Sequence, residues 1–259
     1  MPDLAPLIDI HSHILPAIDD GTFDAREALT MARMAMDDGV GTIIATPHQR
    51  GSFARNHGGE IRTRVAAFQQ LLEQEYLALR ILPGGETRIE PGDAEAEIVA
   101  AVRSGELLTL GNQGRYFLMD LPEDVYVPLD RLVVGLKALG ITAILAHPER
   151  NRGIVSRPET LFPLVEAGCL LQVTAAGVLG EFGQVVQEFA ERLIRQGLVH
   201  LIASDAHHVH YRPPLLAAAI GRVAQLVGGA ATATLSQRNA ASIIAGHPGA
   251  SLPPLPVTA

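Results

Sequence analysis

The chain has 259 residues, of which 47% are hydrophobic and 19% charged, a composition typical of one large folded domain and not of a disordered chain. The formal net charge of -8 and the presence of a single lysine, Lys137, argue against the phosphate backbone of a nucleic acid as a partner. The single cysteine, Cys169, excludes an intramolecular disulfide and a metal site built from several cysteines.

Apolar runs rich in β-branched residues alternate with helix-length segments along most of the chain, which is typical of βα units around a parallel sheet. The predicted strands are Leu7 to Ile10, Thr42 to Thr46, Leu79 to Pro83, Arg115 to Asp120, Ile141 to Ala146, Leu170 to Thr174 and Val199 to Ser204. The predicted helices are Ala25 to Asp38, Ile61 to Tyr76, Asp93 to Arg103, Pro128 to Leu139 and Val185 to Gln196. Glycines at 39, 140 and 197 suit helix C-termini. We therefore expect a single-domain α/β barrel closed by about seven strands.

The domain organisation follows from the same pattern. We expect residues 1–6 to be an N-terminal extension, residues 7–245 to form the domain, and the proline-rich residues 246–259 to be a disordered tail. The segment Arg50 to Gly59 is expected to be an exposed loop and is a candidate lid. The sequence lacks a signal peptide and any apolar run of about 18 residues, so the expected compartment is the cytoplasm.

Potential metal ligands follow or end most of the predicted strands. The first strand leads into His11-Ser12-His13, whose imidazoles point the same way because side chains alternate along an extended chain. The seventh leads into a second pair with this spacing, Asp205 and His207. The remaining candidates are His48, Glu86, Asp120, His147 and also Asp20, which could instead cap the following helix. In a barrel of parallel strands, such residues converge on one face.

These nine side chains are too many for one tetrahedral zinc ion. They predict two or three ions that share bridging carboxylates, with mixed nitrogen and oxygen ligands that suit manganese, iron or zinc. Such clusters activate water and hold the attacking and leaving oxygens of a displacement at phosphorus, so phosphate-ester hydrolysis is the leading chemistry. Arg150 and Arg212 are candidates for binding the phosphoryl oxygens, although either could form a surface salt bridge instead.

Other catalytic classes lack their motifs. A cysteine-dependent phosphatase needs an arginine six positions after the cysteine, and here Ala175 stands six positions after Cys169. The glycine-rich loops that bind nucleoside triphosphates or dinucleotides are absent from the sequence. The Gly-x-Ser-x-Gly elbow of serine hydrolases is also absent.

The motifs resemble those of the PHP (polymerase and histidinol phosphatase) superfamily, and within it the bacterial capsule-type tyrosine phosphatases of exopolysaccharide synthesis. The resemblance covers about Leu7 to Asn239. It is carried by Ile8 to Pro16 with Asp19-Asp20-Gly21, by Ile44 to His48, by Ala146 to Arg150 and by Ala203 to His207. The resemblance implies a distorted (β/α)₇ barrel with three metal ions, usually manganese.

The resemblance also implies a division of the ligands and a role for the arginines. His11, His13, Glu86 and Asp205 would hold one ion, Glu86, Asp120 and His147 a second, and Asp20, His48 and His207 a third. Arg150 and Arg212 match positions that bind phosphate in the family. Asp120 departs from the family pattern, which usually has glutamate there, so the second ion would sit differently or bind less tightly.

Three functional hypotheses follow. The first is a protein-tyrosine phosphatase that acts on the tyrosine-rich C-terminal tail of a bacterial tyrosine kinase, with at most an indirect membrane association through that kinase; a hydroxide held between metal ions would attack phosphorus. The second keeps the site but takes a small phosphate ester such as histidinol phosphate or a nucleotide. The third is a non-catalytic, metal-stabilised module that binds phosphotyrosine or a kinase.

Overall fold

The computed structural model describes residues 6–248, so residues 1–5 of the predicted extension and residues 249–259 of the predicted tail lie outside it. Its strands form two parallel sheets, with the orders β1-β2-β4 and β3-β5-β6-β7-β8-β9. The strands are β1 (Leu7–Ser12), β2 (Val40–Ala45), β3 (His48–Gln49), β4 (Arg80–Pro83), β5 (Glu86–Arg88), β6 (Tyr116–Asp120), β7 (Thr142–Ala146), β8 (Leu170–Thr174) and β9 (Leu201–Ala203). Each of the seven predicted strands is present.

The two sheets are parts of one barrel, because two of the predicted strands continue after a short break. The chain passes from β2 to β3 through Thr46-Pro47 and from β4 to β5 through Gly84-Gly85. Across these breaks the pairing continues, since the Gly84 amide donates to the Ala45 carbonyl at 2.9 Å. The breaks were not predicted. A Cβ on Gly85 would lie 2.0 Å from a side-chain oxygen of Gln49, so a larger residue there would require the buried Gln49 side chain to move.

The barrel closes between its first and last strands. The Asp205 amide donates to the His11 carbonyl at 2.9 Å, and the His13 amide donates to the Ala206 carbonyl at 2.8 Å. Ser12 and Ala206 also form an isolated parallel bridge. The segment that follows β9 is therefore joined to the end of β1. The prediction of a barrel closed by about seven strands is confirmed.

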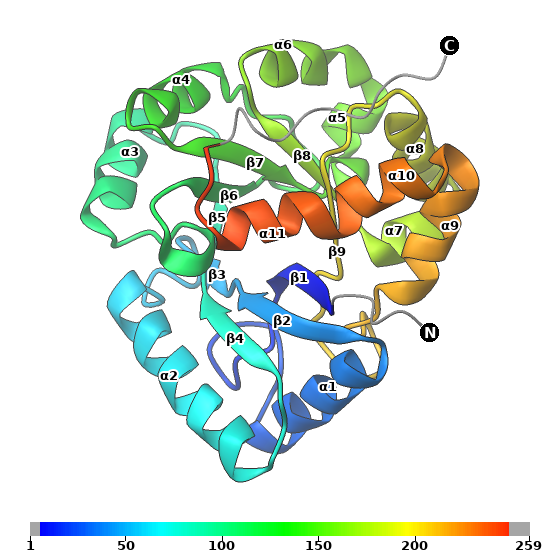
Figure 1. The fold of residues 1–259 in the computed structure, drawn as a ribbon. Coiled ribbons are helices and arrows are strands. Elements are labelled where there is room, and N and C mark those ends of the chain that lie inside the picture. The colour runs from blue at the N-terminus through cyan, green and yellow to red at the C-terminus, as the bar shows by residue number, and fades with distance from the viewer. Residues whose placement is uncertain (1–5, 249–259) are drawn as a thin grey trace.

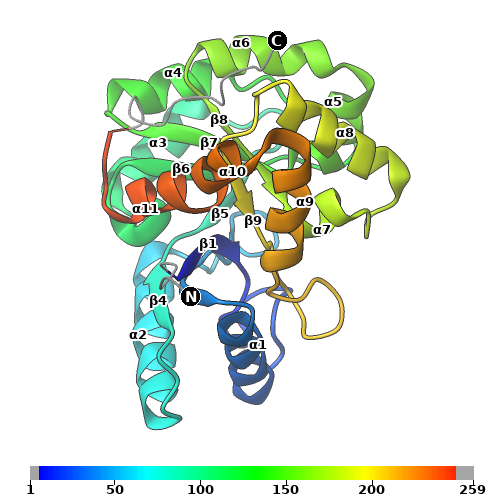
Figure 2. The ribbon, with the colours of Figure 1, turned by 45° about the vertical axis from the view of Figure 1, so that its right-hand side comes forward.

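Helices cover the outside of the barrel (Figures 1 and 2). The five predicted helices correspond to α1 (Ala25–Asp37), α2 (Gly58–Gln74), α3 (Glu95–Ser104), α4 (Asp130–Ala138) and α8 (Gln184–Arg195). The sequence analysis did not identify α5 (Arg152–Ser156), α6 (Leu161–Glu166), α7 (Ala175–Leu179), α9 (Ala217–Val227), α10 (Gly229–Ala233) and α11 (Asn239–Ile244).

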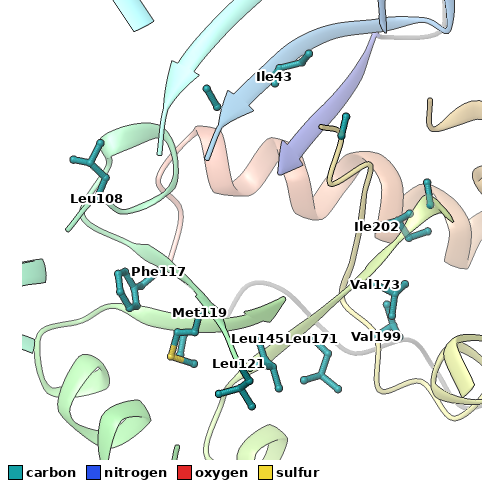
Figure 3. Close-up of a cluster of buried hydrophobic side chains, with 14 of the residues drawn as sticks. Ile43, Leu108, Phe117, Met119, Leu121, Leu145, Leu171, Val173, Val199 and Ile202 are labelled. Carbon is teal, nitrogen blue, oxygen red and sulfur yellow. The ribbon is translucent and has the colours of Figure 1, made fainter. Parts of the chain in front are cut away.

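The strands separate two apolar clusters because neighbouring side chains point to opposite faces. Residues such as Ile43, Phe117 and Met119 belong to the outer cluster between strands and helices, part of which Figure 3 shows. Ile44 and Leu118, their neighbours in sequence, belong to the inner cluster together with residues of α11. In Figures 1 and 2, α11 lies across the strands between the two sheets. Apolar side chains thus fill this part of the barrel, whereas the polar candidate ligands lie near the carboxyl ends of the strands.

Among residues 6–248, none of the helices combines the length and apolarity needed to cross a bilayer. The cytoplasmic location stays a prediction.

Candidate metal centre

All nine predicted metal ligands lie at the carboxyl ends of the strands or in the loops that follow them. Their ligand atoms form four overlapping groups, and within each group these atoms lie within 4.8 Å of one another. The groups are His13, Asp20, His48 and His207; His11, His13 and Asp205; His11, Glu86 and His147; and His48, Glu86 and Asp120. The side chains that the sequence predicted to converge therefore do so.

Glu86 lies at the centre of the cluster and is fully buried. It is the first residue of β5 and pairs in register with His48 of β3, so the two breaks in the barrel place these side chains together. Its Oε1 is 2.9 Å from Nε2 of His147 and 3.4 Å from Nε2 of His11. Its Oε2 is 2.9 Å from Nδ1 of His48 and 3.3 Å from Nε2 of His13. A carboxylate that faces imidazoles through both oxygens is suited to bridge two cations.

Asp205 connects the imidazole cluster to the two predicted phosphate-binding arginines. Its Oδ1 is 3.2 Å from Nε2 of His11 and 3.5 Å from Nε2 of His13. Its Oδ2 accepts a hydrogen bond from Nη1 of Arg150 at 2.8 Å and another from Nη2 of Arg212. Asp205 has a φ of 52°, a left-handed conformation that is uncommon outside glycine and that is found at functional sites.

A further part of the cluster lies nearer to solvent. Oδ1 of Asp20 is 3.4 Å from Nε2 of His48 and 3.6 Å from Nε2 of His207. The Asp20 side chain is 54% exposed, whereas the side chain of Glu86 is buried. Asp20 lies outside α1, whose N-cap is Asp24, so the capping alternative for Asp20 is wrong. Asp20 is placed to hold an ion at the open side of the centre.

Asp120 lies beside two of the candidate histidines, His48 and His147. It shares a group with His48 and Glu86, while His147 shares one with Glu86 and His11. Nδ1 of His147 is 3.8 Å from Asp120, yet the same ring presents Nε2 to Glu86. The other carboxylate oxygen of Asp120 accepts a hydrogen bond from Arg88 at 3.3 Å. The two oxygens of the Asp120 carboxylate therefore face different partners, His147 and Arg88.

The buried imidazole nitrogens and carboxylate oxygens of the cluster are suited to binding divalent cations. Nε2 of His11 and Nε2 of His13 lie only 3.3 Å apart, and both rings are buried. Oε2 of Glu86 and Oδ1 of Asp205 are buried without a hydrogen-bond donor in the part of the chain that the structure describes. Buried acceptors that face one another cost free energy unless something positive lies between them. One or more divalent ions would satisfy all of these atoms.

Glu86, Asp205 and His207 are held in the forms that bind metals, whereas for His11 and His13 burial is outweighed by the nearby carboxylates, which raise the pKa of the imidazoles. Burial would raise the pKa of Glu86 and Asp205, but the neighbouring imidazoles hold both well below the usual range. Burial and the nearby His13 lower the pKa of His207 to about 4, so its imidazole is neutral near pH 7. Ionised carboxylates and neutral imidazoles are the forms that ligate cations. Asp120 differs, because burial and the charge of Glu86 raise its pKa.

Two residues that the sequence analysis did not choose as site residues orient the first histidine pair. Oδ2 of Asp19 lies 2.7 Å from Nδ1 of His13, and Oε1 of Gln172 lies 2.8 Å from Nδ1 of His11. Each bond places the ring proton on Nδ1 and leaves Nε2 free to face the centre. Gln172 had a signal in the sequence, because it is a polar residue within the apolar strand Leu170–Thr174.

Arg150 and Arg212 lie in the cleft that leads to the cluster. The cleft has a volume of about 130 Å³, and its lining includes Asp20, Glu86, Asp120, His147 and both arginines. Both arginines are largely buried and pair with Asp205, and Arg150 also forms a salt bridge with the exposed Glu123. The ring of Phe182 lies 4.9 Å from the guanidinium carbon of Arg150 and 6.0 Å from that of Arg212. Phosphate binding by these arginines stays a prediction.

Comparison with known proteins places the chain in a family. Residues 7–245 match the family described as capsular polysaccharide synthesis, CpsB/CapC. YwqE of Bacillus subtilis strain 168, a tyrosine-protein phosphatase, is 39% identical over 208 residues, which are 80% of this chain and 79% of YwqE. CpsB of Streptococcus agalactiae serotype V, also a tyrosine-protein phosphatase, is 27% identical over 251 residues, covering 93% of this chain and 99% of CpsB.

A solved structure gives the same result. It comes from work on YwqE of Bacillus subtilis and CpsB of Streptococcus pneumoniae, both described as metal-dependent tyrosine phosphatases. It matches this fold with a TM-score of 0.87 at 35% identity and covers 97% of this chain and 100% of the solved chain. The predicted resemblance to capsule-type phosphatases is confirmed, and the chain belongs to the CpsB/CapC family of capsular polysaccharide synthesis proteins.

Proposed function

We propose that this protein is a metal-dependent phosphatase that hydrolyses phosphotyrosine in a protein substrate. The observation that carries the proposal is the position of Asp205, which faces imidazole nitrogens through one oxygen and two guanidinium groups through the other. Candidate metal ligands and phosphate-binding cations therefore line one cleft. The relatives YwqE and CpsB, which are named tyrosine-protein phosphatases, support phosphotyrosine as the substrate class.

In the proposed reaction, bound metal ions and side chains of the protein have different roles. Divalent ions held in this cluster would activate water and neutralise charge on the phosphoryl group. Arg150 and Arg212 each present a planar guanidinium, whose N–H groups match two phosphoryl oxygens. Because Asp205 already holds both guanidinium groups, little reorganisation is needed as charge develops on those oxygens. The oxygen of a water molecule forms the new bond to phosphorus, and the tyrosine oxygen leaves with the electron pair of the P–O bond that breaks.

The proposal assigns three manganese ions. One ion would be held by His11, His13, Glu86 and Asp205, a second by Glu86, Asp120 and His147, and a third by Asp20, His48 and His207. The overlap of the four groups of ligand atoms supports a centre in which several ions share ligands. We further propose that the substrate is the tyrosine-rich tail of a bacterial tyrosine kinase in capsule or exopolysaccharide synthesis, and the family description supports that pathway.

The proposal is tested by phosphate release from matched substrates at increasing Mn²⁺. The substrates are a phosphotyrosine peptide, the corresponding phosphoserine peptide, histidinol phosphate and a nucleoside monophosphate. We expect Mn²⁺-dependent turnover, a preference for the phosphotyrosine peptide, and a loss of about 10³-fold or more in Asp205→Asn. A preference for histidinol phosphate or the nucleotide would show that the substrate is a small phosphate ester and not phosphotyrosine. Binding of phosphotyrosine peptide without hydrolysis under any metal would mean a non-catalytic module.

A further inference from the structure

A second concave surface begins where the metal cleft ends. It has a volume of about 540 Å³, and we call it the valine groove after Val155, Val185 and Val186, which line it together with Phe182. Arg150 and Glu123 line both the cleft and the valine groove, so the two are continuous. The groove lies between α5, the turn before α8 and the first turn of α8.

Apolar side chains make up much of the wall of the valine groove, and two of its charged residues, Arg150 and Arg152, are paired with carboxylates. Val185 is 66% exposed although it lies beside a charged cleft. Nη2 of Arg150 lies 3.0 Å from Glu123, and Nη1 of Arg152 lies 2.9 Å from Asp124. An exposed apolar surface next to a binding site is typical of a contact that a ligand covers. The groove is thus suited to an apolar group and not to a second phosphate.

Phe182 connects the valine groove to the arginines. Its ring packs against the guanidinium groups of both Arg150 and Arg212, and the same residue lines the groove. A phosphate held by these arginines therefore lies next to the wall of the groove. The remainder of a phosphotyrosine substrate extends from the phosphate toward the rim of the cleft, where the valine groove begins.

We propose that the valine groove binds an apolar side chain that lies close to the phosphotyrosine in a protein substrate. This inference rests on the proposed function, because it places the phosphate on Arg150 and Arg212. Its volume is within the range of about 300–1,000 Å³ that is usual for ligand sites and accommodates one or two side chains with their main chain. The groove would make the enzyme select substrates by the residues that flank the phosphotyrosine.

The experiment compares phosphotyrosine peptides that differ only in flanking residues, with leucine or asparagine at each of three positions on either side. A small aryl phosphate, which has no flanking residues, serves as the internal reference. We expect leucine at one or more of these positions to raise kcat/KM by about 10-fold, the usual effect of a modest apolar contact. The small aryl phosphate gives the activity of the metal centre itself.

The variant Val185→Asp makes the groove polar at its most exposed valine. An aspartate is favourable in the first turn of a helix, so this change is expected to leave α8 folded. The matched control is Val134→Asp on α4, because Val134 is 61% exposed and α4 lies on another side of the barrel (Figures 1 and 2). Val185→Asp should abolish the preference for leucine and leave turnover of the small aryl phosphate unchanged, while Val134→Asp should leave both unchanged.

The outcomes separate the groove from the proposed function. If wild-type protein hydrolyses both peptides equally, or Val185→Asp keeps the preference, the groove proposal is wrong while the phosphatase proposal stands. If Val185→Asp instead dissociates a dimer in light scattering and leaves the peptide preference intact, the groove is a contact between copies of this chain. If neither phosphotyrosine peptides nor the aryl phosphate are hydrolysed with Mn²⁺, both proposals fail.

Discussion

Oδ2 of Asp19 lies 2.7 Å from Nδ1 of His13 and also accepts a hydrogen bond from the main-chain amide of His48 at 2.9 Å. One buried carboxylate thus fixes the ring of one candidate ligand and the backbone of another. Burial would raise the pKa of Asp19, but the neighbouring His13 and these hydrogen bonds lower it, so the group is ionised. Carboxylates in this position orient a ligating histidine and increase its basicity.

We therefore expect Asp19→Ala to weaken Mn²⁺ binding by about 10- to 100-fold, the usual effect of removing such a partner. The measurement is metal affinity by calorimetry, with the helical signal as a check of folding. The control is Asp24→Ala in the same β1–α1 segment, because Asp24 caps α1 and touches none of the candidate ligands. Equal Mn²⁺ affinity in Asp19→Ala and wild-type protein would remove Asp19 from the site.

The second prediction concerns Asp120, a position at which the resemblance drawn from the sequence implies glutamate. We expect Asp120→Glu to preserve or raise activity, because one more methylene lets the carboxylate reach toward His147, which now lies 3.8 Å away. Measurement of Mn²⁺ affinity and kcat should show tighter binding of one ion. Arg88→Ala is the companion variant, since it frees the carboxylate of Asp120 from its hydrogen bond without lengthening it. A complete loss of activity in Asp120→Glu would show that the centre is built around the shorter side chain.

The barrel and the convergence of the ligands could be predicted from the sequence, because both follow from strand periodicity. Once parallel strands are placed around a barrel, residues after their carboxyl ends must meet at one rim. The offset between β4 and β5 could not be predicted in this way. At this offset Gly85 lies close to the side chain of Gln49, and the pattern of apolar residues does not indicate this contact.

The orienting partners and the last helices were missed for other reasons. Which of Asp19 and Asp20 orients His13 depends on which carboxylate points toward the cluster. The Asp19 carboxylate does so because it accepts a hydrogen bond from the main-chain amide of His48, 29 residues later in the chain. Helix α9 begins with three alanines, so large apolar residues at helical spacing appear only from Ile220 onward. The paired packing of Arg150 and Arg212 on Phe182 joins three distant segments and has no local signature.

The third prediction tests that packing. Replacing Phe182 with leucine keeps an apolar side chain but removes the aromatic face under both guanidinium groups, an interaction of about 0.5–2 kcal/mol for each. We expect Phe182→Leu to lower kcat for both the small aryl phosphate and phosphotyrosine peptides by about 5-fold, with Mn²⁺ affinity unchanged. Val185→Asp, in contrast, should affect only the peptides.

Phe189→Leu is the matched control, because Phe189 packs against Arg192 at 4.8 Å on α8 and has no contact with the cleft. It should reduce stability and leave kcat unchanged. If Phe182→Leu also left kcat for the aryl phosphate at the wild-type value, the ring would have no part in positioning the arginines.

The fourth prediction concerns the pH dependence of stability and uses a histidine outside the metal cluster. His200 is buried between β8 and β9, and burial lowers its pKa to about 4. Its Nδ1 accepts a hydrogen bond from the Leu171 amide at 3.3 Å, which a protonated ring could not do. The unfolded chain, in which this histidine has the usual pKa near 6.5, therefore binds the proton first as the pH falls.

Because the unfolded state binds more protons than the folded state below about pH 6.5, the free energy of unfolding falls through this window and the loss levels off below about pH 4. This difference between the pKa of His200 in the folded and unfolded states corresponds to a total loss in the free energy of unfolding on the order of 3 kcal/mol. Chemical denaturation of His200→Gln and wild-type protein between pH 7 and pH 4, both metal-free, isolates the contribution, since the other titrating groups are common to both. We expect the stability of the variant relative to wild type to increase as the pH falls, and parallel curves would show that His200 is not held neutral.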